Sequence, residues 1–240
     1  MADYTLYYWP IPFRGQFVRA VLSYAGCSWQ EAGPDATMKQ RASDPAQQLV
    51  AHMGPPVLTD HQSDVHISQM PAILAYLGEK HSLLSGDPVR KAMCHKVVAD
   101  ANDVLYEMTR YNGSRMWTDA AWSEFLPRLH RWMEIFEDTG RRNGMTAGSG
   151  FMLGTDAPLV ADLVMSTLWG TMTAKFPPLR AVLETHAPAT AGLTDRISAL
   201  QTQKDLRDWS DATFGDGWCG GQIEASLRKV LKSAPPKADR

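Results

Sequence analysis

The chain is 240 residues long, with 44% hydrophobic residues and a formal net charge of −2 at pH 7. This length and composition allow either one large buried core or two smaller ones. The charge balance gives no reason to expect nucleic acid as a partner, because binding the phosphate backbone requires a basic surface.

The cysteines and the apolar runs limit the class of protein further. Cys27, Cys94 and Cys219 are far apart and form no Cys-x-x-Cys pair, so neither a dithiol centre nor a metal site is indicated. So few cysteines, odd in number, fit a reducing compartment. We find neither a signal-peptide pattern nor an apolar run of the roughly 20 residues that a membrane span requires. We therefore expect a soluble cytoplasmic protein with no membrane segment.

The N-terminal part predicts alternating strands and helices. Residues 4–9 are dominated by aromatic and β-branched types, which favour a strand. From about Arg14 the apolar residues recur at helical spacing, and Gly26 ends that helix. Residues 27–50 predict a short strand near 28–31 and then a poorly defined helical segment.

A hairpin and a helix follow. Residues 57–59 and 65–67 predict two short antiparallel strands, because the polar residues between them suit a tight turn. Apolar residues from Met70 to Leu77 then recur three and four positions apart, and Gly78 is the predicted end of this helix.

Residues 82–88 are rich in turn-forming residues, which indicates a linker. After this linker the sequence pattern predicts only helices. One apolar stripe runs from Cys94 to Met108. A second runs from Trp122 to Phe136, and Pro127 within it predicts a kink or a late start. Helical spacing returns after the glycine-rich segment 144–154. The pattern predicts an α/β part followed by an all-α part.

Four segments of the sequence resemble the glutathione transferase family, in particular its tyrosine-type, bacterial-like members. In residues 4–16 a strand ends in Tyr-Trp and is followed by Arg-Gly, as at the start of the family's first domain. Residues 54–58 resemble the segment with the family's cis-proline, and residues 69–77 resemble the start of its third helix. Residues 158–163 resemble the start of the central helix of the helical domain. The four motifs occur in the family's order and spacing.

This resemblance covers roughly residues 4–210 and implies a fold. The expected fold is an N-terminal thioredoxin-like, glutathione-binding domain over residues 1–81, followed by a C-terminal helical bundle over 89–214. Residues 215–240 extend past the family's usual end as a C-terminal tail. Within the tail, residues 223–232 predict a short basic helix, which is either a lid on the substrate pocket or a frayed terminus.

Tyr8 is the predicted catalytic residue. In the family, a tyrosine hydroxyl at this place donates a hydrogen bond to the sulfur of glutathione, which lowers the pKa of the thiol from about 8.5. The thiolate then attacks an electrophilic carbon. A strand tyrosine more often only packs, but the position just ahead of Arg14 favours catalysis. Tyr7 points to the opposite face of the strand, so only one of the two reaches the site. Two residues within Pro10–Phe13 are inserted relative to the family pattern.

The resemblance also implies which residues bind glutathione. They are Trp9, Arg14, Pro55, Gln69 and Met70. Pro56 aligns with the family's cis-proline, and Pro55 before it has no N–H, so only its carbonyl can pair with the peptide. Gln69 and Met70 begin a helix whose free N–H groups favour a carboxylate. Met70 stands where the family has a serine, and Ser68 is an alternative source of the hydroxyl.

The helical part carries two further expectations. Asp162 resembles the family's capping aspartate, and because Leu159 replaces the usual Ser or Thr, Asp156 is an alternative N-cap. The pocket for a hydrophobic co-substrate is expected near the end of the first long helix. Its predicted residues are Tyr106, Arg110 and Tyr111, with Trp117 nearby, and the alternative for Tyr106 is an aromatic core stripe.

Two functions from different classes fit these patterns. The first is an enzyme that uses Tyr8 to conjugate glutathione, its co-substrate, to a small hydrophobic electrophile, as in detoxification. The second is a non-catalytic binding protein of the same fold, which the departures at Pro55 and Met70 favour. A glutathione-dependent isomerase or dehalogenase is a variant of the first. The resemblance also implies a homodimer.

Overall fold

A four-stranded sheet forms the N-terminal part of the computed structural model, which describes residues 2–233. The strands are β1 (Tyr4–Tyr7), β2 (Trp29–Glu31), β3 (Val57–Asp60) and β4 (Val65–Ser68), in the order β2-β1-β3-β4. β1 is parallel to β2 and antiparallel to β3, which pairs antiparallel with β4. A parallel pair needs a crossover, and α1 (Phe13–Tyr24) supplies it.

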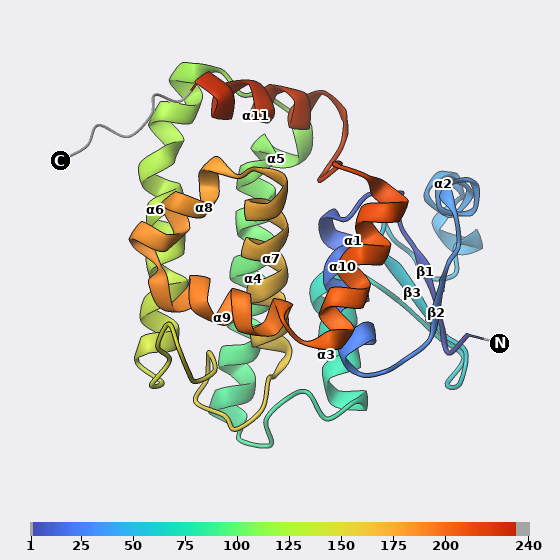
Figure 1. Ribbon diagram of the computed structural model, residues 1–240. Helices are drawn as coiled ribbons and strands as arrows, with labels where there is room; N and C mark the ends of the chain where they lie inside the picture. The colour runs from blue at the N-terminus through green and yellow to red at the C-terminus, as the bar shows by residue number, and fades with distance from the viewer. Residues whose placement is uncertain (1, 234–240) are drawn as a thin grey trace.

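Helices cover both faces of this sheet (Figure 1). α1 and α3 (Met70–Lys80) lie between the sheet and the helical part, whereas α2 (Pro34–Ala42) lies on the outer side and is followed by the short 3-10 turn Pro45–Gln47. The apolar stripes of α1 and α3 are buried, as their helical spacing predicts. The sheet is therefore packed against the helical part through α1 and α3.

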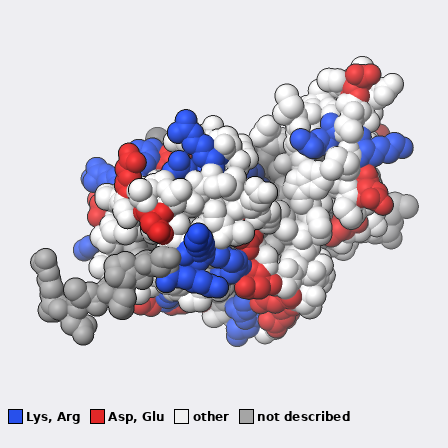
Figure 2. All heavy atoms as spheres, turned by 90° about the horizontal axis from the view of Figure 1, so that it is seen from above, with Lys and Arg blue, Asp and Glu red and all other residues white. Residues whose placement is uncertain are grey.

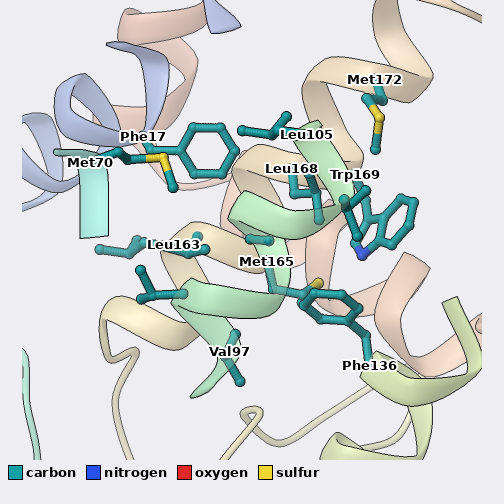
Figure 3. Close-up of a cluster of buried hydrophobic side chains, with 14 of the residues drawn as sticks. Phe17, Met70, Val97, Leu105, Phe136, Leu163, Met165, Leu168, Trp169 and Met172 are labelled. Carbon is teal, nitrogen blue, oxygen red and sulfur yellow. The ribbon is translucent and has the colours of Figure 1, made fainter. Parts of the chain in front are cut away.

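The remaining helices form a bundle around α7 (Val160–Lys175). The others are α4 (Pro88–Met108), α5 (Arg110–Gly113), α6 (Asp119–Arg141), α8 (Pro178–His186), α9 (Pro188–Ser198), α10 (Gln201–Phe214) and α11 (Gly221–Ser233). α7 is buried on nearly all sides, which is expected of a helix that is apolar all round. Figure 3 shows its side chains packed among those of neighbouring helices, including Leu105 of α4, Phe136 of α6 and Phe17 of α1.

The predicted fold class is confirmed, because a thioredoxin-like α/β domain precedes a helical domain. Three details were wrong. α3 does not end at Gly78 but continues to Lys80. α6 begins at Asp119, so Pro127 lies inside the helix and does not mark a late start. The N-cap of α7 is Leu159, and the alternative of Asp156 is wrong.

The buried carboxylate of Asp162 fixes the start of α7. It accepts hydrogen bonds from the N–H of Leu159 at 2.8 Å and of Met152 at 2.7 Å. One half of the family's capping box is therefore retained without a hydroxyl partner. Within residues 2–233, no helix is long and apolar enough to cross a membrane.

Candidate functional site

The register of the sheet brings three predicted site segments to one end of it. Val57, the first residue of β3, pairs with the last residues of β1 and β4, which are Tyr7 and Ser68. These three residues form one row across the sheet. The next residue beyond this row is Tyr8 after β1, Pro56 before β3 and Gln69 after β4. Strands of a sheet lie about 4.8 Å apart, so these three positions are close neighbours.

Tyr8 occupies the position after β1 with its hydroxyl held in place. The hydroxyl oxygen accepts a hydrogen bond from the backbone N–H of Arg14 at 3.0 Å. The ring lies against Gly15, where an added Cβ would stand only 2.3 Å from a ring carbon. Only 4% of the residue is exposed. Among the residues that the structure describes, no acceptor receives the proton of this hydroxyl.

The surroundings keep Tyr8 protonated. Burial raises the pKa of Tyr8 to about 12, although the charges of Arg14 and Arg19 and the N–H of Arg14 act in the opposite direction. The phenol is therefore neutral at physiological pH. A neutral hydroxyl with an unassigned proton is a hydrogen-bond donor for an anion at the end of the sheet.

Arg14 joins the two domains beside Tyr8. Its Nε donates to Oδ1 of Asn102 in α4 at 3.1 Å, and its guanidinium lies 4.8 Å from the centre of the Phe13 ring. Within residues 2–233 it forms no ion pair. A partly buried cation without a carboxylate partner is suited to an anionic ligand. Trp9, also predicted here, is half-buried against the core.

The start of α3 offers less to a carboxylate than the resemblance implies. Gln69 is the N-cap residue, and its φ of 71° is a backbone conformation that side chains other than glycine rarely adopt. The side chain of Met70 is only 1% exposed and points into the core near Phe17 (Figure 3). Pro71 has no N–H. The first turn therefore presents the N–H groups of Met70 and Ala72, with no hydroxyl from Met70.

The loop before β3 has the backbone that the sequence predicts. The peptide bond between Pro55 and Pro56 is cis, which confirms the prediction for Pro56. Pro55 is half-buried and, lacking an N–H, has only its carbonyl for a peptide ligand. Ser68, the alternative hydroxyl, is the last residue of β4 and half-buried.

The residues predicted for the hydrophobic pocket lie on and just after α4. Tyr106 and Tyr111 form a ring pair with centres 5.2 Å apart and are 42% and 50% exposed, so Tyr106 is not part of a core stripe. Tyr106 stands one turn beyond Asn102, on the face of α4 that meets Arg14. The guanidinium of Arg110 lies 4.9 Å over the ring of Trp117, which is buried.

The chain makes an unusual turn at this place. Arg110, Tyr111 and Asn112 all have a positive φ, between 47° and 63°, so the segment assigned as α5 is a left-handed turn. Such backbone is strained for residues other than glycine and is most often found at binding sites. The turn lifts the Tyr111 ring beside Tyr106.

A C-terminal segment, residues 216–220, also packs beside the site, in a contact with Phe13 that the sequence did not predict. The carbonyl of Trp218 accepts from the N–H of Phe13 at 3.1 Å, and the two rings meet edge to face at 5.2 Å. We call residues 216–220 the strap. Trp218 is fully buried, and α11 packs on the helical domain, so a frayed terminus is wrong for the part of the tail up to Ser233. Residues 234–240 of the predicted tail lie outside the described residues.

Glu224 holds the strap in place. One of its carboxylate oxygens accepts the N–H groups of Trp218, Cys219 and Gly220 at 2.6 to 2.9 Å. The other accepts from Arg228 at 2.7 and 2.9 Å. Burial raises the pKa of Cys219 to about 12, so this cysteine beside the site is a thiol at neutral pH. The only sequence signal for the strap was its Trp between glycines.

From above, the molecule is hollowed where the smaller lobe meets the larger one (Figure 2). On this face, basic side chains gather in a few small groups, and acidic side chains lie beside several of them. The fold and the groups at the end of the sheet define a class of protein in which a thioredoxin-like domain lies next to a helical domain. Its site presents a tyrosine hydroxyl and an arginine that pairs with no carboxylate within residues 2–233.

Comparisons with known proteins show which family has this architecture. The family model for the glutathione S-transferase C-terminal domain matches residues 93–230. The chain belongs to the glutathione S-transferase family. No curated protein matches the sequence.

Several solved structures share the fold at low sequence identity. A Nu-class GST from Haemonchus contortus is 19% identical with a TM-score of 0.69, and the match covers 89% of this chain and 100% of that one. The structure named NaGST-2 is 18% identical with a TM-score of 0.69, and NaGST1 is 19% identical with a TM-score of 0.68. Both matches cover 87% of this chain and 97% of the other.

Proposed function

We propose that this protein is a tyrosine-type glutathione transferase, in which Tyr8 stabilises the thiolate of glutathione for attack on a small hydrophobic electrophile. The observation that carries the proposal is the hydroxyl of Tyr8, which accepts from the N–H of Arg14 and whose proton has no acceptor among residues 2–233. The motifs at residues 4–16 and 69–77 support the tyrosine-type, bacterial-like assignment. Detoxification of electrophiles is the role that this chemistry serves.

The size of the effect follows from one hydrogen bond. A hydrogen bond to a charged group is worth about 1.5–3 kcal/mol, and one pKa unit corresponds to about 1.4 kcal/mol. The Tyr8 bond therefore lowers the pKa of the bound thiol by about 1–2 units from its free value near 8.5. At neutral pH the thiolate fraction rises from a few per cent to about half.

The remaining predicted residues divide between the two substrates. Arg14 supplies a positive charge, and the first turn of α3 after Gln69 supplies N–H groups for a glutathione carboxylate. The carbonyl of Pro55 and the indole of Trp9 flank the peptide. Tyr106, Arg110 and Tyr111 present aromatic surface and one cation to the electrophile.

Turnover of a chromogenic aryl halide with glutathione tests the proposal. We expect the Tyr8→Phe variant to lose about 10–100-fold in kcat/KM, which corresponds to the loss of about 1.5–3 kcal/mol. Tyr7→Phe is the matched control, because Tyr7 is the neighbouring tyrosine on the other face of β1. Equal rates for wild type and Tyr8→Phe would refute the role of Tyr8.

A non-catalytic, glutathione-binding protein is the second candidate. The buried side chain of Met70 and the missing N–H of Pro55 favour it, since both remove polar contacts from the peptide site. Calorimetric titration with glutathione measures binding, which both candidates predict and which a protein without a glutathione site would not show. Binding without turnover of any aryl halide supports the second candidate.

The assembly and boundaries complete the proposal. We propose the domains 1–81 and 89–214 with a tail 215–240, a cytoplasmic location and a homodimer. In the single chain, Met53 is 89% exposed, the highest value among the large hydrophobic side chains described, and a second copy would cover such a residue. Light scattering of the purified protein at two concentrations measures the oligomeric state.

A further inference from the structure

An open cavity of about 430 Å³, whose wall combines apolar surface with several hydroxyl and amide side chains, lies on another side of α1, between α1, α7, α9 and α10. Figure 1 shows α10 running beside α1, which forms one wall. Gln16 lines this cavity, whereas Arg14 meets α4. Residues two apart in a helix point about 200° apart, so the cavity faces away from the glutathione site. Its volume lies within the range of about 300–1,000 Å³ that small-molecule sites have.

The amide of Gln16 is the first sign of a missing ligand. Gln16 is 5% exposed and forms no side-chain hydrogen bond within residues 2–233, and its Oε1 is fully buried. Leaving a buried polar group unpaired costs about 1–3 kcal/mol. Buried polar groups in folded proteins are almost always paired with protein, water or ligand. Because Gln16 lines the cavity, a rotation of its terminal amide would bring this oxygen to a partner inside it.

The hydroxyl groups of the wall are arranged as acceptors. Thr167, Thr171 and Thr194 each donate their proton to a helix carbonyl, at 2.6 to 2.9 Å. Ser166 does the same across the helix pair at 3.3 Å. The free lone pairs of these hydroxyls accept hydrogen bonds from the cavity. The hydroxyl of Ser210 has no partner among the described residues and can donate or accept.

Two of the three cations around the cavity are closely paired with carboxylates, and the third, Arg207, is half exposed and lies 3.7 Å from Asp208. Lys175 pairs with Asp211 at 2.7 Å, and Arg180 pairs with Asp195 through two hydrogen bonds of 2.7 and 2.8 Å. An anion would therefore compete with carboxylates at the rim and meet oxygen lone pairs inside. A cation would meet ammonium and guanidinium groups that are already paired. The interior favours a neutral ligand with several O–H donors.

We propose that this cavity is a second binding site for a small neutral polyhydroxylated molecule, of the size of a mono- or disaccharide. Its hydroxyl groups donate to the threonine oxygens of α7 and α9 and pair with the amide of Gln16. The inference is independent of the proposed transferase reaction, because none of these side chains contacts Tyr8.

Saturation-transfer NMR with glucose and trehalose tests the proposal on the full chain. We expect transfer from wild type to at least one sugar, and binding at least about tenfold weaker in Gln16→Leu, which removes the amide. Ser210→Ala is a milder second variant, for the case in which Gln16→Leu does not fold. Gln222→Leu is the matched control, because Gln222 is an exposed glutamine on α11.

The outcomes are distinct. Transfer that is kept in Gln222→Leu and weakened in Gln16→Leu or Ser210→Ala supports the site. The proposal is overturned by no transfer to either sugar, or by transfer that is equal in all variants. Displacement of the sugar by millimolar inorganic phosphate would also overturn it, since that result shows an anion site.

Discussion

Replacing Glu224 by Gln removes the charge that holds the strap against the start of α1. The carboxylate is 7% exposed, accepts three backbone N–H groups and pairs with Arg228. Gln keeps one acceptor oxygen and turns an amide N–H₂ group toward either the guanidinium or the backbone N–H groups. Hydrogen bonds to charged groups are worth about 1.5–3 kcal/mol each, and in the variant the contacts with the backbone N–H groups persist in weaker form. We therefore expect the free energy of unfolding to fall by about 2–4 kcal/mol.

Chemical and thermal unfolding at pH 7 measure this loss. In a chain of this length about 1 kcal/mol corresponds to about 2–4 °C, so Tm should fall by about 5–15 °C. Glu184→Gln is the matched control, because Glu184 also pairs with an arginine four residues away but is 55% exposed. A surface pair is worth less than about 1 kcal/mol. A Glu224→Gln variant as stable as this control would refute the role of the strap contact.

The pH dependence gives a second check with a defined sign. Burial raises the pKa of Glu224, but the N–H groups of Gly220 and Trp218 and the charge of Arg228 outweigh it, so the net pKa lies below its ordinary 4.5. A depressed pKa contributes stability above the unfolded-state value, which is lost as the pH falls through the folded-state value. The difference between wild type and Glu224→Gln should shrink below about pH 4.5. A difference that stays constant to pH 3 would contradict the electrostatic explanation.

Two further predictions test the groups around Tyr8. Arg19 is fully buried, and it binds Glu31 through two hydrogen bonds of 2.9 Å and the carbonyl of Ile11 at 3.0 Å. Arg19→Lys keeps the charge but cannot form this fork, so it should lower the free energy of unfolding in denaturant by about 1.5–3 kcal/mol. A loss below 1 kcal/mol would refute the importance of the fork. Gly15→Ala should push the Tyr8 ring aside and lower kcat by up to about 100-fold. Gly86→Ala is the control, because an added Cβ there meets open space and should leave kcat unchanged. Equal kcat for the two variants would refute the idea that Gly15 positions the Tyr8 ring.

The fold could be predicted largely from local patterns. The strands, the helix starts and the central helix α7 follow from residue types and periodicity, and the cis bond at Pro56 from the resemblance. At Met70, reasoning from helical periodicity and reasoning from the family resemblance gave different predictions. Its place in the apolar stripe of α3 indicated a core side chain, while the resemblance placed it at a ligand position. The structure has the side chain in the core.

The parts that could not be predicted depend on contacts between distant segments. The contact of Trp218 with Phe13 joins residues about 200 positions apart, and no local pattern marks such a pair. The left-handed turn at Arg110–Gly113 ends in Asn-Gly, a common turn signal, but its first two residues are Arg and Tyr, whose types do not predict a positive φ. The unpaired amide of Gln16 is visible only when its neighbours in space are known.

The most direct test of the proposed function is the titration of the thiol of bound glutathione, followed by the ultraviolet absorbance of the thiolate. The account predicts a pKa about 1–2 units below the free value of about 8.5 in wild type and in Tyr7→Phe, and a return toward about 8.5 in Tyr8→Phe. The same pKa in wild type and Tyr8→Phe, with glutathione bound to both, would contradict it.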